Sequence, residues 1–203
     1  MRNLNIAAAM TVAALMSQAV QAETTYIRAG SLLDTQTGRV ARNAVIVVDD
    51  EMITAVGDSS TSIPDGATVI DLSDSFVLPG VMDMHTHVVG NLANNFFAGY
   101  FQSPHRATIG GVVNAEKTLM AGFTTIRNVG AGDYMDVAIR NAINAGEIPG
   151  PRMAVSGPGL GITGGHCDRN SLNSSFEERS DGVADGPWAV REQVRKNVKY
   201  GAD

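Results

Sequence analysis

The sequence holds a single cysteine, Cys167, among its 203 residues. One cysteine excludes both an internal disulfide framework and a zinc module built from four cysteines. Aromatic residues make up only 5% of the chain, and histidine occurs four times. Hydrophobic residues nevertheless reach 44%, so the composition is that of a globular protein with a core and excludes a disordered chain.

Basic residues are also scarce. Lysine and arginine number 15 against 21 aspartates and glutamates, which gives a net charge of −6. A nucleic-acid-binding surface needs a concentration of positive charge, so we expect no nucleic-acid partner.

Long hydrophobic runs are absent except at the N-terminus. Arg2 is the only charge in the first 22 residues, residues 6–16 are apolar, and Val20-Gln21-Ala22 has small residues where a signal peptidase cleaves. The pattern predicts a signal peptide over residues 1–22 and export to the periplasm or the extracellular space. No later run is long enough to cross a bilayer, so we expect no membrane association after cleavage.

Residues 23–75 have the pattern of a small β unit. Alternating and β-branched segments predict strands at residues 26–30, 44–48, 52–56 and 68–70. The second and third of these flank a short polar turn, which indicates a hairpin. We therefore predict a small, mainly antiparallel β unit.

From residue 76 onward, strands alternate with helices. Strands are predicted at residues 76–84, 123–129 and 152–156, the first of them buried and kinked at Pro79-Gly80. Residues 115–121 are predicted as the end of a helix, and further helices are predicted at 133–145 and from Pro187. The last helix has Val190, Val194 and Val198 on one face, which we expect to pack inward. This alternation predicts an α/β fold with a parallel sheet, either open and doubly wound or closed into a barrel.

His85-Thr86-His87 lies at the carboxyl end of the first of these strands. Residues two apart in a strand share a face, so both imidazoles are expected to point the same way and to suit a divalent transition metal. Asp83 shares that face and is a candidate carboxylate for orienting a ligand, or simply a buried polar group with its hydrogen bonds satisfied.

At these residues the sequence resembles a family. The segment Leu78-Pro79-Gly80-Val81-Met82-Asp83-Met84-His85-Thr86-His87 is similar to the first-strand motif of the metal-dependent amidohydrolases. Residues 121–128, 150–152, 156–158 and 162–166 resemble the exported branch that includes Xaa-Pro dipeptidases, and also the imidazolonepropionase-like group. The resemblance covers residues 23–203.

The resemblance implies a (β/α)8 TIM-like barrel preceded by half of a small β-sandwich. His85 and His87 match two ligands of a centre that holds two divalent ions, expected to be zinc. The other ligands and the catalytic residues are expected beyond residue 203. The 128 residues from 76 onward also fall well short of the ~250 that a complete barrel takes. We therefore expect a barrel portion of about three βα units, truncated before strand four and inactive alone.

The same resemblance suggests a function and roles for three further positions. It implies hydrolysis of a C–N bond in a small-molecule amide or dipeptide, with an Xaa-Pro dipeptide as the first candidate and a cyclic amide or imide as the alternative. His166 is expected to contact the substrate. Cys167 stands where a small residue is usual, and could coordinate metal, oxidise or do neither. Asn128 stands where aspartate is usual.

A non-enzymatic alternative stays open, in which the chain is a truncated exported protein without a complete centre. An open parallel sheet exposes strand edges that invite association, so a homo-oligomer stays open as well.

Overall fold

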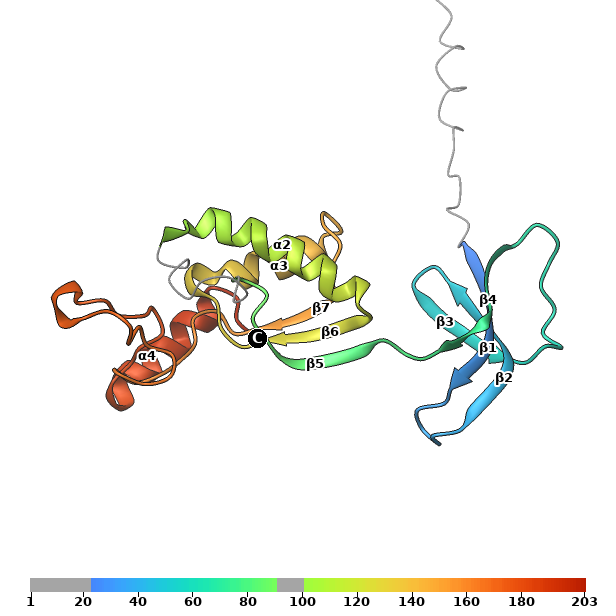
Figure 1. The fold of residues 1–203 in the computed structure, drawn as a ribbon, viewed down its shortest axis with the longest axis horizontal. Helices are drawn as coiled ribbons and strands as arrows, with labels where there is room; N and C mark the ends of the chain where they lie inside the picture. Colours follow the sequence, from blue (N-terminus) through green and yellow to red (C-terminus); the bar gives the residue numbers. More distant parts are fainter. Residues whose placement is uncertain (1–22, 91–100) are drawn as a thin grey trace, which may run out of the picture. The chain divides into compact units, whose positions relative to one another are not determined.

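The structure is a computed structural model and describes residues 23–90 and 101–203. The predicted signal peptide, residues 1–22, lies outside the described residues. The chain forms two compact units that divide between Pro79 and Gly80 (Figure 1). The division lies just beyond the boundary predicted at residue 75, because the last strand of the first unit continues to Val77.

The first unit is a four-stranded sheet in the order β3-β2-β1-β4. Its strands are β1 (Thr24–Leu33), β2 (Val40–Asp49), β3 (Met52–Gly57) and β4 (Thr68–Val77). The predicted hairpin is confirmed, since β2 and β3 pair antiparallel with Asp49 opposite Met52. The pair of β1 with β4 is parallel, so the unit is less uniformly antiparallel than its sequence indicates.

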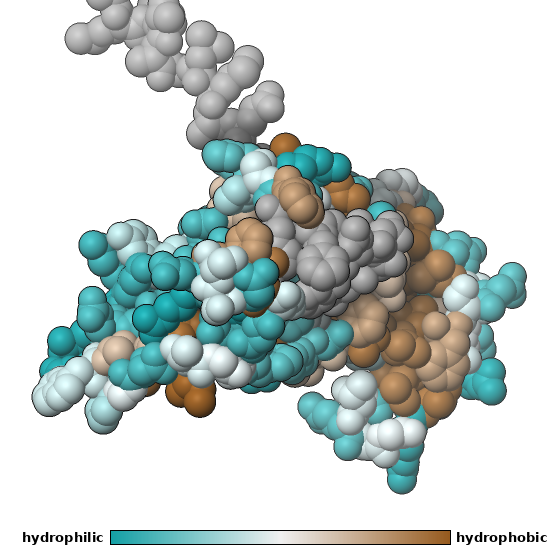
Figure 2. Space-filling model, turned by 60° about the vertical axis from the view of Figure 1, so that its left-hand side comes forward, coloured by the Kyte–Doolittle hydropathy of each residue, from teal (hydrophilic) through white to brown (hydrophobic). Residues whose placement is uncertain are grey.

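This sheet buries only a narrow set of side chains. Ala29, Ala44, Val45 and Ile46 are buried at its centre. Other apolar side chains of the sheet are half-buried or exposed, and Met52, at 68%, is the most exposed of them. Figure 2 shows hydrophobic side chains at the molecular surface. The described unit is thus one sheet, and its role as half of a small β-sandwich stays a prediction.

The second unit is built on a three-stranded parallel sheet in the order β5-β6-β7. Its regular elements alternate as predicted: β5 (Val81–Thr86), α2 (Pro104–Met120), β6 (Phe123–Asn128), η1 (Gly132–Tyr134), α3 (Met135–Asn144), β7 (Arg152–Val155), η2 (Ser174–Phe176) and α4 (Gly186–Lys199). Helices α2 and α3 lie against the sheet (Figure 1). The prediction of an α/β fold with a parallel sheet is confirmed.

The prediction of one buried strand over residues 76–84 is wrong. The segment is two strands, β4 and β5, that belong to different sheets and are separated at Pro79-Gly80. Proline has no N–H to donate to a strand ladder, which favours a break at this point. A side chain at Gly80 would also meet the Thr124 side chain at 2.1 Å. Strand β5 is mostly exposed rather than buried, with Met82 at 66%.

The core of the second unit lies between the sheet and its helices. Seven buried residues form it: Val88, Ala115, Ile126, Val137, Ile139, Met153 and Val155. Ile126 and Ile139 are among the largest side chains that are fully enclosed. This apolar layer holds the carboxyl ends of the strands in place, and those ends carry the candidate site.

Helix α4 begins with Pro187 in its first turn, as predicted, but it packs through a face next to the one expected, and of the three valines only Val190 is half-buried. Val194 is 46% exposed and Val198 is 64% exposed, whereas Gln193 is buried. The reason is polar: Asn197 donates to the carbonyl oxygens of Ser156 (3.2 Å) and Pro158 (3.0 Å), just after β7. Those hydrogen bonds turn Asn197 and the buried Gln193, rather than Val194 and Val198, toward the segment after β7.

Within the described ranges, no helix combines the length and the apolar character needed to cross a membrane.

Candidate active site

The strand register brings three chain segments to one edge of the parallel sheet. Thr86 of β5 is opposite Asn128 of β6, and Asn128 is opposite Val155 of β7. Residues that follow these strands therefore gather at the same edge, where parallel α/β folds build their sites.

His85 and His87 lie at the end of β5 with their side chains exposed. Their ring centroids are 5.5 Å apart and the ring planes meet at 71°. Two imidazoles bound to one tetrahedral zinc at ~2.0–2.1 Å per nitrogen would have ring centroids about 5 Å apart. The rings are therefore close to the separation that a shared ion requires, so the residues fit as two ligands.

Asp83 acts on the main chain of this strand. Its Oδ1 accepts a hydrogen bond from the backbone N–H of His85 at 3.0 Å. Of the two roles considered for Asp83, orienting a ligand or satisfying its own hydrogen bonds, this contact involves the backbone of His85 and not its ring. Arg127 supports the same strand from β6, donating through Nε to the carbonyl oxygen of Met84 at 2.7 Å.

A buried polar pair lies behind His87. Asn128 and Asp136 are both 0% exposed, and Asn128 Nδ2 donates to Asp136 Oδ2 at 3.0 Å. Asn128 Oδ1 accepts from the backbone N–H of Val88 at 2.8 Å, and Asp136 Oδ2 accepts from that of Gly157 at 3.1 Å. The pair thus joins the ends of β5, β6 and β7. Sequence reasoning noticed Asn128 only as a departure from a pattern and missed Asp136.

His87 and His166 line one pocket at this edge of the sheet, with a volume of about 310 Å³. Cys167 lines it too, as do the ionisable side chains of Arg169 and Asp181. The remaining lining residues follow the strand ends: Val89, Val129, Gly130, Ala131, Gly132, Met135, Pro158, Gly159, Ser180 and Gly182. His85 is not among the lining residues, so the structure unites two of the three predicted histidines in this pocket.

Two carboxylates hold the loop that carries His166. Asp168 accepts from the backbone N–H groups of Gly164 (2.9 Å) and Ser180 (3.1 Å). Asp185 accepts from both the backbone N–H and the hydroxyl of Thr163. The loop is therefore ordered by hydrogen bonds to two carboxylates that its glycines and its histidine did not indicate in the sequence.

These hydrogen bonds shift the ionisation of both carboxyls. Backbone N–H groups, that of Gly164 first, lower the pKa of Asp168 below its ordinary 3.8. The Thr163 hydroxyl does the same for the pKa of Asp185. Both side chains are thus held as carboxylates, the form that accepts the hydrogen bonds of the loop.

Close backbone packing completes the loop. Gly161 and Val183 form a parallel bridge, in which Ala184 donates to the carbonyl oxygen of Gly161 at 2.8 Å. A Cβ on Gly182 would lie 1.9 Å from the carbonyl oxygen of Gly159, so only glycine fits there.

The donor set for a metal is incomplete in the part of the chain that the structure describes. There, no three side chains of histidine, cysteine, aspartate or glutamate are grouped so that they could hold an ion. A catalytic zinc site takes three protein ligands and an open position. His85 and His87 would therefore supply two ligands of a larger set.

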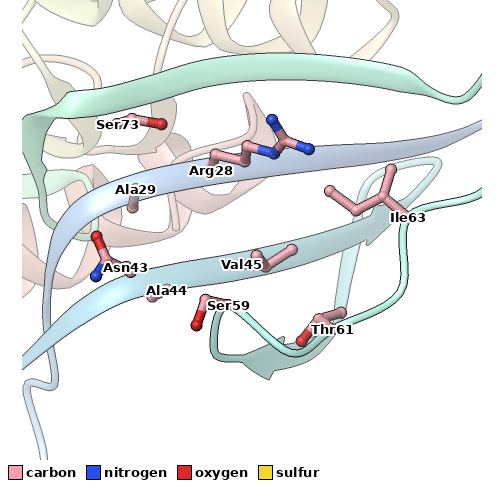
Figure 3. Close-up of a pocket in the computed structure, with 9 residues that line it drawn as sticks. All are labelled: Arg28, Ala29, Asn43, Ala44, Val45, Ser59, Thr61, Ile63 and Ser73. Atoms are coloured by element: carbon pink, nitrogen blue, oxygen red, sulfur yellow. The ribbon is translucent and has the colours of Figure 1, made fainter.

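A second pocket, in the first unit, has a different character. Its volume is about 400 Å³, and the side chains around it are small or neutral except for Arg28 (Figure 3). No histidine, cysteine or carboxylate is among the described residues that line it. The groups suited to hydrolytic chemistry therefore lie in the pocket of His87 and His166.

Comparison with known proteins agrees with this geometry. Residues 76–203 match the model of the amidohydrolase family. The structure of an Xaa-Pro dipeptidase with methionine bound in its active site superposes with a TM-score of 0.77 and 33% identity, over 89% of this chain and 45% of that chain. A prolidase complexed with N-methylphosphonate-L-proline gives a TM-score of 0.73 and 30% identity, over 88% of this chain and 45% of that chain.

Among curated proteins, ochratoxinase of Aspergillus niger is 31% identical over 202 residues, which is 90% of this chain and 41% of ochratoxinase. The chain thus spans less than half the length of these relatives. The likenesses confirm the predicted fold class, an α/β chain that forms part of a TIM-like barrel domain.

Proposed function

Because this chain belongs to the amidohydrolase family, we propose that it supplies the first metal ligands and part of the substrate pocket of a hydrolase that cleaves C–N bonds in amides. The substrate class we propose is the Xaa-Pro dipeptide. The likeness to a Xaa-Pro dipeptidase and to a prolidase, each at 30% identity or more over most of this chain, supports that choice.

One observation carries the proposal. His87 serves both parts of the site, since its ring lies beside that of His85 and also lines the pocket that contains His166. The proposed metal ligands and the proposed substrate pocket therefore share the imidazole of His87. The pocket volume of about 310 Å³ is at the lower end of the range for small-molecule sites, which suits a compact dipeptide.

Each histidine has a distinct task in this proposal. His85 and His87 hold a divalent ion, expected to be zinc, and when bound the ion would supply Lewis-acid polarisation of the scissile carbonyl. His166 donates a hydrogen bond to the carboxylate of the dipeptide. The loop carboxylates Asp168 and Asp185 keep His166 at the pocket while the substrate exchanges.

The incomplete donor set defines what the 203 residues do alone. With two candidate ligands among its described residues, the chain by itself is proposed to bind a metal weakly and not to turn over substrate. We also propose export, on the strength of the signal-like residues 1–22; N-terminal sequencing of the mature protein should then begin at Glu23.

Hydrolysis of Xaa-Pro dipeptides by the intact protein, followed by release of free proline, tests the proposal. His87→Ala should reduce kcat/KM by more than the ~10–100-fold typical of residues that only orient ligands. His166→Ala should raise KM more than it lowers kcat, because it binds substrate outside the reacting bond. The matched control is His105→Ala, an exposed histidine on α2, which should leave both constants unchanged.

Two outcomes would contradict different parts of the proposal. If His87→Ala has unchanged activity, His87 is not a metal ligand needed for catalysis. An intact protein that cleaves other amides but not Xaa-Pro dipeptides would overturn the substrate class and leave the amide hydrolase.

A further inference from the structure

A buried amide stands directly behind His87. Asn128 ends β6, is fully buried, and accepts a hydrogen bond through Oδ1 from the backbone N–H of Val88, the residue after His87. Its Nδ2 donates to Asp136 Oδ2 at 3.0 Å and to the carbonyl oxygen of Gly130 at 3.3 Å. Asn128 therefore contacts both the backbone that follows His87 and the carbonyl of Gly130, which lies beside the His87 ring.

Asp136 decides which way this amide faces. A carboxylate only accepts hydrogen bonds, so the NH2 end of Asn128 must turn toward it and the oxygen must turn toward Val88. Asp136 is itself fixed, because it also accepts from the backbone N–H groups of Val137 (2.9 Å) and Gly157 (3.1 Å). The orientation of Asn128 is thus determined by its partners.

The carbonyl of Gly130 links the amide to the imidazole. His87 Nδ1 lies 3.5 Å from this oxygen, which also accepts from Asn128. A carbonyl oxygen cannot donate, so the imidazole must carry its proton on Nδ1 to make the contact. The lone pair is then on Nε2, the nitrogen that remains available for a ligand.

We propose that Asn128 and Asp136 form a positioning pair that holds His87 as its Nδ1–H tautomer, with Nε2 presented to the metal. The metal part rests on the function proposed above, whereas the tautomer is a property of the chain itself. The pair acts at a distance: Asn128 holds the Val88 N–H and the Gly130 carbonyl, and these hold the ring.

Nitrogen NMR of the protein labelled with ¹⁵N-histidine reads the tautomer directly. At about pH 8.5, where free imidazole is neutral, His87 should show a protonated Nδ1 and an unprotonated Nε2. In Asn128→Ala its signals should move toward the Nε2–H form. His85 has no contact with this amide in the structure and serves as the internal control in the same spectrum.

A matched variant separates positioning from general damage. Asn114, on α2, donates to the carbonyl oxygens of Val88 (2.8 Å) and Gly90 (3.1 Å), so Asn114→Ala disturbs the same segment without touching Gly130. It should leave the His87 tautomer as in the wild type. A proton on Nε2 of His87 in the wild-type protein would overturn the proposal. Because this result comes from the wild-type spectrum alone, the test stands even if Asn128→Ala fails to fold.

A zinc titration distinguishes this proposal from the function it rests on. Asn128→Ala should weaken zinc binding by about 10–100-fold, with Asn114→Ala close to wild type. If His87 is the Nδ1–H tautomer but the protein binds no zinc, the proposed metal site is refuted and the positioning role of Asn128 and Asp136 stands. If the protein binds zinc tightly but His87 is the Nε2–H tautomer, the positioning role of Asn128 and Asp136 is refuted and the proposed metal site stands.

Discussion

Replacing Asn128 by aspartate tests the buried pair with the smallest change in shape. Asn128→Asp keeps the acceptor for the Val88 N–H but places a carboxyl where an amide now donates to Asp136 at 3.0 Å. Both positions are fully buried. At this separation two ionised carboxylates repel by about 5 kcal/mol, taking an effective dielectric constant of ~20.

Protonation limits this cost. The introduced carboxyl avoids the repulsion by taking up a proton, and its pKa is therefore raised above the ordinary value near 3.9. At pH 7 that proton costs about 4 kcal/mol, at ~1.4 kcal/mol for each unit between the pH and the ordinary pKa. Once protonated, it donates to Asp136 as the amide does. The variant should thus lose about 4 kcal/mol of unfolding free energy at pH 7.

The pH dependence has a definite sign. A carboxyl whose folded pKa is raised binds more protons folded than unfolded, so its penalty grows as the pH rises above the unfolded pKa. The loss in Asn128→Asp should shrink to about 1.5 kcal/mol at pH 5 and nearly vanish near pH 4.

Urea unfolding of the protein at pH 7 and pH 5 provides the assay. The control is Asn141→Asp, an exposed position of the same residue type on α3, which should change stability by no more than about 0.5 kcal/mol. A loss below 1 kcal/mol at pH 7, or a loss that does not shrink at pH 5, would refute the buried pairing.

Three further predictions concern the core and the loop. Ile126→Ala removes a fully buried side chain and should cost about 2–5 kcal/mol in urea unfolding, and a cost under 1 kcal/mol would contradict its place in the core. Gly182→Ala would place a Cβ 1.9 Å from the Gly159 carbonyl oxygen, so the loop beside the pocket must shift. The affinity for the dipeptide should therefore fall, while the second unit still unfolds cooperatively. An unchanged affinity would contradict the close packing of this loop. Because the pKa of Asp168 is lowered, the hydrogen bonds that its carboxylate accepts from the loop should be complete above pH 3.8 and be lost as the pH falls further. Their loss should appear as faster amide hydrogen exchange at Gly164. A Gly164 exchange rate that does not change relative to core amides would contradict this prediction.

Local patterns predicted the order of the elements well. The hairpin of β2 and β3 and the alternation of β5, β6 and β7 with helices follow from side-chain periodicity and turn residues, which act over a few positions. The break at Pro79 is also a local signal, but the apolar residues on both sides of it made one strand appear continuous. Sequence alone did not show that these residues join two different sheets.

The errors arise where polar contacts outweigh apolar periodicity. The valine face of α4 predicted the wrong orientation, because Asn197 reaches carbonyl groups about 40 residues earlier in the chain. Likewise Asp136 looks like an ordinary acidic residue in the first turn of a helix, and its partner Asn128 is identified only when the strands are paired. The histidine pair was visible because its two members stand two residues apart at the end of one strand, whereas the carboxylates that fix the His166 loop are far apart in the sequence and gave no such pattern.

The metal content of the intact protein tests the central claim most directly. The wild-type protein and the double variant His85→Ala/His87→Ala are dialysed against metal-free buffer, and bound divalent ions per chain are counted by elemental analysis. We predict two ions per chain in the wild type, fewer in the double variant, and loss of dipeptide hydrolysis when a chelator removes the metal from the wild type. A double variant with the full metal content, or a metal-free protein that still hydrolyses dipeptides, would contradict it.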